Sequence, residues 1–138
     1  MSDQQDWNKT VIKEFRANQG KVGGYFQNIP LLLLHTTGAK SGKQRVNPVA
    51  YIKDGDRYVV IASKGGAPSH PDWYHNLAAN PDVRVEVGTE SFDARATITE
   101  EPERTKLFTQ VETLYPGFKE YRMKTDRVIP VITLTRTN

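Results

Sequence analysis

Residues 45–62 of the chain are RVNPVAYIKDGDRYVVIA, a stretch with the pattern of a β-hairpin. Asp54-Gly55 lies between two segments rich in β-branched and aromatic residues, which is a strong local sign of a tight hairpin turn. We therefore expect antiparallel strands over residues 45–53 and 57–62. Such a hairpin favours an antiparallel sheet over the regular strand–helix alternation of parallel sheets.

Outward from the hairpin, the hydrophobic periodicity predicts short elements throughout the chain. Further strands are expected over residues 31–36, 83–87, 91–99 and 128–135, and helices over residues 7–18, 71–79, 101–114 and 118–124. Ser69 or His70 is expected to cap the second helix, with Pro71 in its first turn. Six antiparallel strands would curl or close to remove their edges. The prediction is a mainly β fold with packed helices (α+β), a small and partly open β-barrel.

The composition excludes several classes of protein. A length of 138 residues is that of one domain. The absence of Cys excludes disulfides, thiolate zinc sites, iron–sulfur clusters and Cys nucleophiles. Three His without helical ligand spacing or an acidic cluster predict no metal site. The longest apolar run, residues 30–34, is too short to span a bilayer, and no signal peptide is recognisable. We expect a cytoplasmic protein.

The positive charge is concentrated near the N-terminus. The whole chain has a net charge of +3, but residues 7–53 contain eight Lys or Arg and one acid, for +7. An anionic partner bound there is one explanation, and nucleic acid, a phosphorylated cofactor and an acidic membrane surface all fit. A solvated basic face without a ligand explains the pattern equally well.

Two loops have compositions suited to binding an anion or a flat ligand. Residues 36–45, TTGAKSGKQR, join two expected strands and combine glycines, hydroxyls and three bases. Backbone N–H groups in such a turn can form an anion site, with Lys40 and Arg45 supplying charge and Ser41 a hydroxyl. Residues 62–67, ASKGGA, could lie close against a flat ligand. Ordinary exposed turns remain the alternative for both.

No catalytic dyad is recognisable from the residues themselves. Trp73 and Leu77 are expected to face the core, and His35 to be a hydrogen-bonded structural residue. Tyr115, Phe118 and Tyr121 form either an aromatic wall beside a ring system or a small satellite core. An anion loop and a glycine-rich loop without acid–base groups favour an enzyme in which a cofactor does the chemistry.

These segments together resemble the deazaflavin-dependent nitroreductase and quinone reductase family, whose members bind coenzyme F420. The similarity runs from about Leu31 to Leu134. Its blocks are TTGAKSG (36–42), RVNP (45–48), ASKGGA (62–67), PDWYHNL (71–77) and YPGF (115–118). The resemblance implies a split β-barrel like that of the FMN-binding relatives of pyridoxamine-phosphate oxidase. It divides the chain into a variable N-terminal helical segment, residues 1–30, and a deazaflavin-binding barrel, residues 31–138.

The resemblance also implies roles for individual residues. Those expected to bind the coenzyme are Ala39, Lys40, Ser41, Arg45, Val46, Asn47, Pro48, Val49, Ala50, Ile61, Ala62, Ser63, Lys64, Asp72, Trp73, Tyr74, His75, Asn76 and Phe118. Ser63, Tyr115 and Tyr121 are expected at the reaction centre. In the nitroimidazole-activating branch three Tyr shape the acceptor pocket, and Phe118 stands here in place of the middle one.

The implied reaction is hydride transfer from reduced coenzyme F420 to a quinone, with nitro compounds as adventitious acceptors and no metal. The N-terminal helix could cover the pocket or contact a membrane. Two alternatives stay open: an oxidoreductase with the same barrel that binds FMN, or haem, in place of F420, and a non-enzymatic barrel for single-stranded nucleic acid. A carrier that binds deazaflavin without turnover is a third. The oligomeric state is not predicted.

Overall fold

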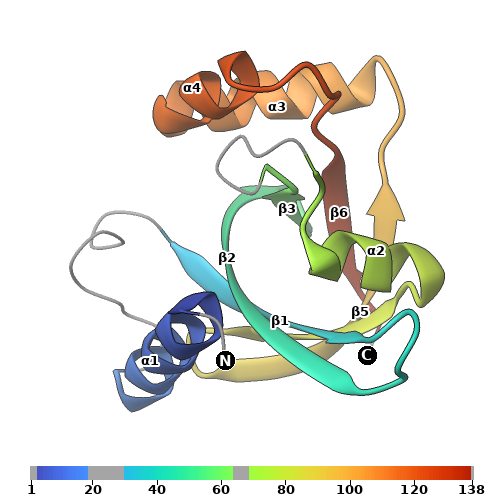
Figure 1. Ribbon diagram of the computed structural model, residues 1–138. Coiled ribbons are helices and arrows are strands. Elements are labelled where there is room, and N and C mark those ends of the chain that lie inside the picture. The colour runs from blue at the N-terminus through green and yellow to red at the C-terminus, as the bar shows by residue number, and fades with distance from the viewer. Residues whose placement is uncertain (1–2, 19–29, 64–68, 138) are drawn as a thin grey trace.

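The computed structural model describes residues 3–18, 30–63 and 69–137, and Figure 1 shows a barrel with helices around it. In chain order the elements are α1 (Asp3–Ala17), β1 (Leu31–Thr37), β2 (Gln44–Asp54), β3 (Arg57–Ile61), α2 (Asp72–Ala79), β4 (Asp82–Val87), β5 (Glu90–Ile98), α3 (Glu103–Leu114), α4 (Gly117–Met123) and β6 (Val131–Arg136). The predicted elements are all present, and the mainly β fold with packed helices is confirmed.

The six strands found in the described residues pair antiparallel in a closed ring, in the order β1-β2-β3-β6-β5-β4. The predicted hairpin is the β2–β3 pair, with Asp54 opposite Arg57. The ring closes because β1 pairs with β2 along one edge and with β4 along the other, where Leu34 lies opposite Val85. The barrel is therefore more complete than the partly open one predicted, since β1 has no free edge.

The apolar run of β1 is buried on both faces of the strand. Leu32 and Leu34 belong to the core inside the barrel. Leu31 and Leu33 point outward and pack against Phe15 of α1, which is 1% exposed. A strand covered on both sides has no polar face, and this explains why the sequence here is continuously apolar rather than alternating.

Two further helices complete the packing of the barrel. α2 contributes Trp73 and Leu77 to the barrel core, as the sequence predicted. α3 covers the outer face of β2, β3 and β6 with Leu107, Phe108 and Val111. In Figure 1 the α3–α4 pair stands beyond the β3 and β6 end of the barrel, away from α1.

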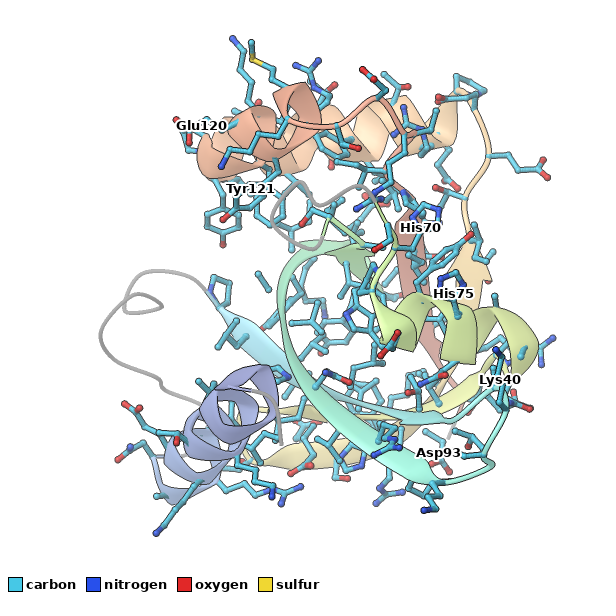
Figure 2. The ribbon with its side chains drawn as sticks, in the orientation of Figure 1. Lys40, His70, His75, Asp93, Glu120 and Tyr121 are labelled. Carbon is cyan, nitrogen blue, oxygen red and sulfur yellow. The ribbon has the colours of Figure 1, made fainter. Side chains whose placement is uncertain are left out.

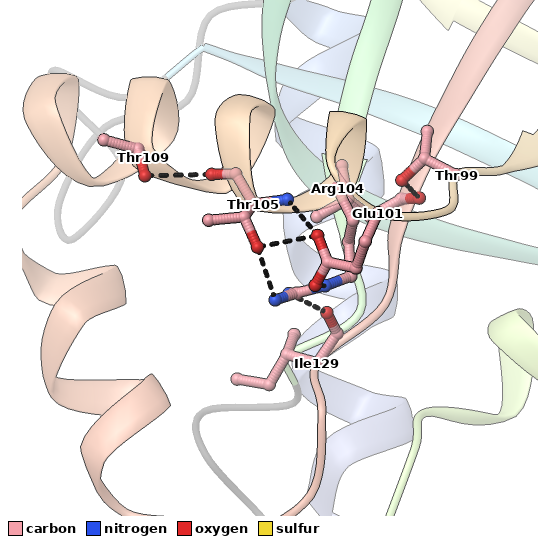
Figure 3. Close-up of polar contacts among 7 residues, drawn as sticks. Thr99, Glu101, Arg104, Thr105, Thr109 and Ile129 are labelled. Carbon is pink, nitrogen blue, oxygen red and sulfur yellow. Dashed lines mark hydrogen bonds and ion pairs between the residues drawn. The ribbon is translucent and has the colours of Figure 1, made fainter.

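A polar cluster joins the start of α3 to the segment before β6 (Figure 3). The Glu101 carboxylate accepts hydrogen bonds from the backbone N–H of Thr105 at 3.0 Å and from Arg104 Nε at 2.9 Å. Arg104 Nη1 also donates to the carbonyl oxygen of Ile129 at 3.0 Å. A hydrogen bond from the Thr105 hydroxyl to the Glu101 carboxylate, at 2.7 Å, together with the bonds from Arg104 Nε and the Thr105 N–H, holds the pKa of Glu101 below its usual range. The cluster fixes α3 against the barrel.

Most element boundaries lie one or two residues from the prediction, α1 begins four residues earlier, at Asp3, and two differences have a visible cause. α2 begins at Asp72 with Pro71 at the N-cap position and no side-chain capping bond, so neither Ser69 nor His70 is the cap. Pro71 takes the N-cap position because its carbonyl oxygen accepts the first hydrogen bond of the helix, from the N–H of Tyr74 at 3.1 Å. β6 begins at Val131 instead of residue 128, because pairing with β3 starts only at the Ile61–Val131 pair.

Within the described residues, no helix is long and apolar enough to cross a membrane.

Candidate functional site

A cavity of about 980 Å³ lies where α1, the β1–β2 loop, β2 and the N-terminal half of α2 meet. Its walls are formed by Lys9, Ile12, Gly38, Ala39, Lys40, Ser41, Gln44, Arg45, Val46, Asn47, Asp72, His75 and Asn76. Figure 2 shows Lys40 on the β1–β2 loop and His75 on α2 on the same side of the molecule. The cavity is thus built by segments that are far apart in the sequence.

The β1–β2 loop is a tight turn that depends on two glycines. Gly42 has φ +70°, a left-handed conformation that glycine adopts without strain. The N–H of Gly38 donates to the carbonyl oxygen of Lys43 at 2.8 Å. A Cβ at Gly38 would lie 2.5 Å from Ser41 Oγ and 3.3 Å from the Lys43 oxygen. The close packing of this turn brings Ala39, Lys40 and Ser41 together at the cavity.

Asn76 of α2 holds the loop in place from the other side of the cavity. Its Oδ1 accepts a hydrogen bond from the N–H of Ala39 at 3.0 Å, and its Nδ2 donates to Thr36 Oγ1 at 3.2 Å. Asn76 is 8% exposed and Thr36 is 1% exposed. A buried amide satisfied on both ends by the loop and the strand before it fixes the position of the loop relative to α2.

The cavity wall is positively charged. Among the described residues, its ionised side chains are those of Lys9, Lys40 and Arg45 against the single acid Asp72. Lys40 and Arg45 are exposed, so they can turn toward a ligand without a large cost of desolvation. This charge, together with the hydroxyl of Ser41 on the cavity wall, suits an anionic ligand.

The structure brings together many of the residues that the sequence singled out. Nine of them line the cavity: Ala39, Lys40, Ser41, Arg45, Val46, Asn47, Asp72, His75 and Asn76. Four others are core side chains: Val49, Ala62 and Trp73 inside the barrel, and Ile61 under α3. Pro48, Ala50 and Tyr74 are half-buried and do not belong to the cavity wall. Lys64 lies outside the described residues.

Ser63 ends the described segment that follows β3 and is 6% exposed. It is not part of the cavity wall, although its backbone is held firmly by an arginine from another part of the chain. The glycines and Ala67 of the ASKGGA block lie outside the described residues, so this second predicted loop stays a prediction.

The three aromatic residues predicted near the acceptor form a chain of ring contacts. The ring centroids of Tyr115 and Phe118 are 6.4 Å apart, and those of Phe118 and Tyr121 are 5.4 Å apart. Tyr115 and Phe118 pack on the core beneath α3, as a satellite core would. In Figure 2 Tyr121 points from α4 toward the barrel. None of the three lines the described cavity.

Three residues at or near this site escaped the sequence analysis. Lys9 and Ile12 of α1 line the cavity, because the packing of Phe15 on β1 brings the helix alongside β2. Arg127, before β6, reaches the backbone of Ser63. The basic face of the N-terminal helix was a signal for Lys9, whereas nothing in the local pattern points to Arg127.

α1 is joined to the barrel by an ion pair as well as by apolar packing. Arg16 Nη2 and Glu86 Oε2 are 2.8 Å apart, and His35 Nε2 lies 2.5 Å from the same oxygen. The hydrogen bond from Arg16, with His35 adding to it, holds the pKa of Glu86 below its usual range. The prediction that His35 is a hydrogen-bonded structural residue is confirmed.

Among the described residues, no group of three or more His, Cys, Asp or Glu is placed to hold a metal ion.

Comparison with solved structures identifies the class of barrel. A Listeria innocua protein named after pyridoxamine 5′-phosphate oxidase superposes with a TM-score of 0.56 at 10% identity, covering 94% of this chain and 93% of that one. At this identity the likeness concerns the fold alone, and that fold is the FMN-binding-like split β-barrel. An F420-H2 dependent reductase superposes with a TM-score of 0.70 at 43% identity, covering 76% of this chain and 93% of the other.

Residues 7–136 match the family described as F420H(2)-dependent quinone reductase, and the chain belongs to this family. An F420H(2)-dependent quinone reductase of Mycobacterium tuberculosis is 42% identical over 126 residues, which cover 88% of this chain and 85% of the relative. The family predicted from the sequence blocks is confirmed.

Proposed function

We propose that this protein is an oxidoreductase that transfers a hydride from reduced coenzyme F420 to a quinone. The observation that carries the proposal is the basic cavity between the β1–β2 loop and α2, in a chain of the F420H(2)-dependent quinone reductase family. The loop residues that the resemblance assigned to the coenzyme are the ones that line this cavity.

The cavity fits the coenzyme in size and in charge. A volume of about 980 Å³ is at the upper end of the range of small-molecule sites, which suits a large ligand. Coenzyme F420 is anionic through its phosphodiester and its glutamyl tail, and the described part of the wall has three cations against one acid. The turn at Gly38, where a Cβ would lie 2.5 Å from Ser41 Oγ, places the Ser41 hydroxyl beside the cations Lys40 and Arg45 in the same loop.

The polar part of the coenzyme is assigned to the β1–β2 loop. Lys40 and Arg45 would form charge-assisted hydrogen bonds with its phosphate and carboxylates, and Ser41 would add a neutral one. Lys9 would approach from α1 as a third cation. Asn76 does not need to touch the ligand, because its bond to the N–H of Ala39 already sets the position of the loop.

The ring part is assigned to the opposite end of the site, near the residues that follow β3. When bound, the coenzyme supplies the hydride. Ser63 is proposed to donate a hydrogen bond to the acceptor oxygen, which stabilises the negative charge that develops on it. Solvent or this hydroxyl would deliver the proton. Ile61 and Ala62 contribute backbone only, because their side chains are in the cores.

The acceptor proposed for the reaction is a quinone, with nitro compounds as adventitious substrates. Burial raises the pKa of Tyr115, so its hydroxyl remains protonated near neutral pH and can donate a hydrogen bond. Tyr121 is the second candidate donor, while Phe118 can only pack.

The division into residues 1–30 and a barrel from residue 31 also remains a proposal, as does contact of the N-terminal segment with a membrane. The packing of α1 beside the cavity favours its role as a wall.

The test is a fluorescence titration of the purified protein with oxidised coenzyme F420, with FMN titrated in parallel. Selective F420 binding followed by turnover of menadione with reduced F420 would support the proposal. Binding of FMN alone would overturn the cofactor assignment and keep the barrel. Binding of neither, with salt-dependent binding of a single-stranded oligonucleotide, would support the nucleic-acid alternative instead.

The double variant Lys40→Ala/Arg45→Ala tests the loop assignment. We expect its F420 affinity to fall about 30-fold, or about 2 kcal/mol, since both cations are exposed and each charge-assisted bond is partly screened by water. The matched control is Lys106→Ala/Arg95→Ala, which removes the same charges from outside the cavity wall. Equal affinities of the two double variants would contradict the assignment.

A further inference from the structure

Arg127 binds three groups from two distant parts of the chain. It lies between α4 and β6, and its guanidinium Nη2 donates to the carbonyl oxygen of Ser63 at 2.6 Å. Its Nη1 is 3.2 Å from the carbonyl oxygen of Ala62 and 2.8 Å from Nδ1 of His70. One half-buried side chain thus joins the end of β3 to the residue before the N-cap of α2.

The contact with Arg127 defines the chemical state of His70. A guanidinium has five N–H donors and no acceptor, so Nδ1 of His70 must be the acceptor. The imidazole is therefore neutral, with its proton on Nε2. Burial, followed by the positive charge of Arg127 and by His75, lowers the pKa of His70 and keeps this form at neutral pH.

His70 in turn contacts two rings of α2, one of which lines the cavity. Its ring centroid lies 4.7 Å from that of Tyr74 and 5.9 Å from that of His75, both in the first turn of α2. His75 lines the cavity. Figure 2 shows His70 and His75 on the side of the molecule where Lys40 also lies. The titratable and charged groups placed against His70 in the described structure are Arg127, Tyr74 and His75.

We propose that Arg127 is a positioning residue for hydride transfer, which holds the Ser63 backbone and the neutral His70 ring so that the ring end of the coenzyme site keeps one geometry. The inference rests on the proposed function, because it concerns the same site. Arg127 lies outside the described cavity wall, so its effect passes through Ser63 and His70.

The planar fork of an arginine is needed for this role. Two nitrogens of one rigid group face two carbonyl oxygens and a ring nitrogen at once. A lysine has the same charge but is a flexible point donor, so it cannot reproduce the three directions together. Arg127→Lys therefore separates the geometry from the charge, and Arg127→Met removes both while keeping much of the apolar stem.

The experiment compares these two variants with the wild-type protein and with Arg95→Met. Arg95 forms an exposed pair with Asp82 and serves as the matched control. The first measurement is an NMR titration of the imidazole nitrogens of His70 in the protein without coenzyme. The second is the Kd for oxidised F420 by fluorescence, and the third is kcat and KM with reduced F420 and menadione.

In the Arg127→Met protein we expect the pKa of His70 to rise and the Nε2–H tautomer to lose its preference. We expect kcat to fall at least about tenfold in both Arg127 variants, since small misplacements of reacting groups are costly. The Kd for F420 should stay within about threefold, because the loop around Lys40 supplies the charge contacts. Arg95→Met should match the wild type in all three measurements.

Three results would overturn the inference. If kcat is unchanged in Arg127→Lys and Arg127→Met while the His70 titration shifts, Arg127 is a structural contact only. If the His70 titration does not respond to Arg127→Met, the constraint on the imidazole is wrong. If the wild-type protein neither binds F420 nor reduces menadione, the proposed function itself is wrong. The variants alone test only the role of Arg127.

Discussion

Replacing Asn76 by alanine should weaken both the fold and the site. The change removes the hydrogen bonds to Thr36 Oγ1 and to the N–H of Ala39. Thr36 is 1% exposed, so its hydroxyl would lose a partner that water cannot easily replace. A buried polar group left unpaired costs about 1–3 kcal/mol. Loss of the second bond costs less than about 1 kcal/mol, because water can reach the N–H of Ala39 in the exposed loop and replace part of that bond.

A loss of about 2 kcal/mol is therefore expected in the free energy of unfolding. For 138 residues the entropy of unfolding near the midpoint is about 0.3 kcal/mol/K, so Tm should fall by about 7 °C. The coenzyme should bind roughly three- to tenfold more weakly, because the β1–β2 loop must now be ordered on binding. Urea unfolding, a thermal melt and an F420 titration measure the three quantities.

Two further variants make the test specific. Asn80→Ala removes a longer bond, 3.4 Å from Nδ2 to the carbonyl oxygen of Thr37, and should cost less than about 0.5 kcal/mol. Asn76→Asp keeps an acceptor for the N–H of Ala39, so stability should partly return, while its negative charge should weaken binding of the anionic coenzyme further. Equal stability losses in Asn76→Ala and Asn80→Ala would refute this account of how the loop is held.

Three more predictions concern α1 and the acceptor. Lys9→Ala should weaken F420 binding about threefold, as loss of an exposed cation does, while Lys13→Ala on the same helix should not. If the two variants bind F420 with equal affinity, α1 is not part of the site. Glu86→Gln should cost about 1 kcal/mol at pH 7, discounted because Arg16 is half exposed. Since the folded pKa of Glu86 is lowered, the stabilisation is present above the ordinary carboxyl pKa and is lost as pH falls through the lowered value, so the cost measured by urea unfolding should shrink steadily as the pH is taken below the ordinary carboxyl pKa. Phe118→Tyr should raise turnover of a nitroimidazole with reduced F420, and unchanged turnover would show that the missing hydroxyl does not limit it.

The short-range features of the fold were predictable because neighbouring residues determine them. Gly55 and Gly88 have φ of +61° and +59° at the two hairpin turns, as the Asp-Gly and Gly-Thr pairs indicated. Alternating Val residues in β4 and the i, i+4 pair Trp73 and Leu77 in α2 show which side faces the core. The cap of α2 was predicted one or two positions too early, at Ser69 or His70 instead of Pro71, because several polar residues there could serve as a cap.

The sequence by itself determined the strand and helix types, the hairpin pairing, the anion-binding composition of residues 36–45 and the family. These depend on local dihedral preferences, on the period of apolar residues and on recognisable blocks. Only the tertiary structure decided that β1 closes the ring with β4, that Lys9 reaches the cavity and that Arg127 binds the carbonyl of Ser63. Each of these contacts joins segments about 30 to more than 60 residues apart. Their positions follow from the packing of whole elements, such as Phe15 on β1, and no short window of sequence contains that information.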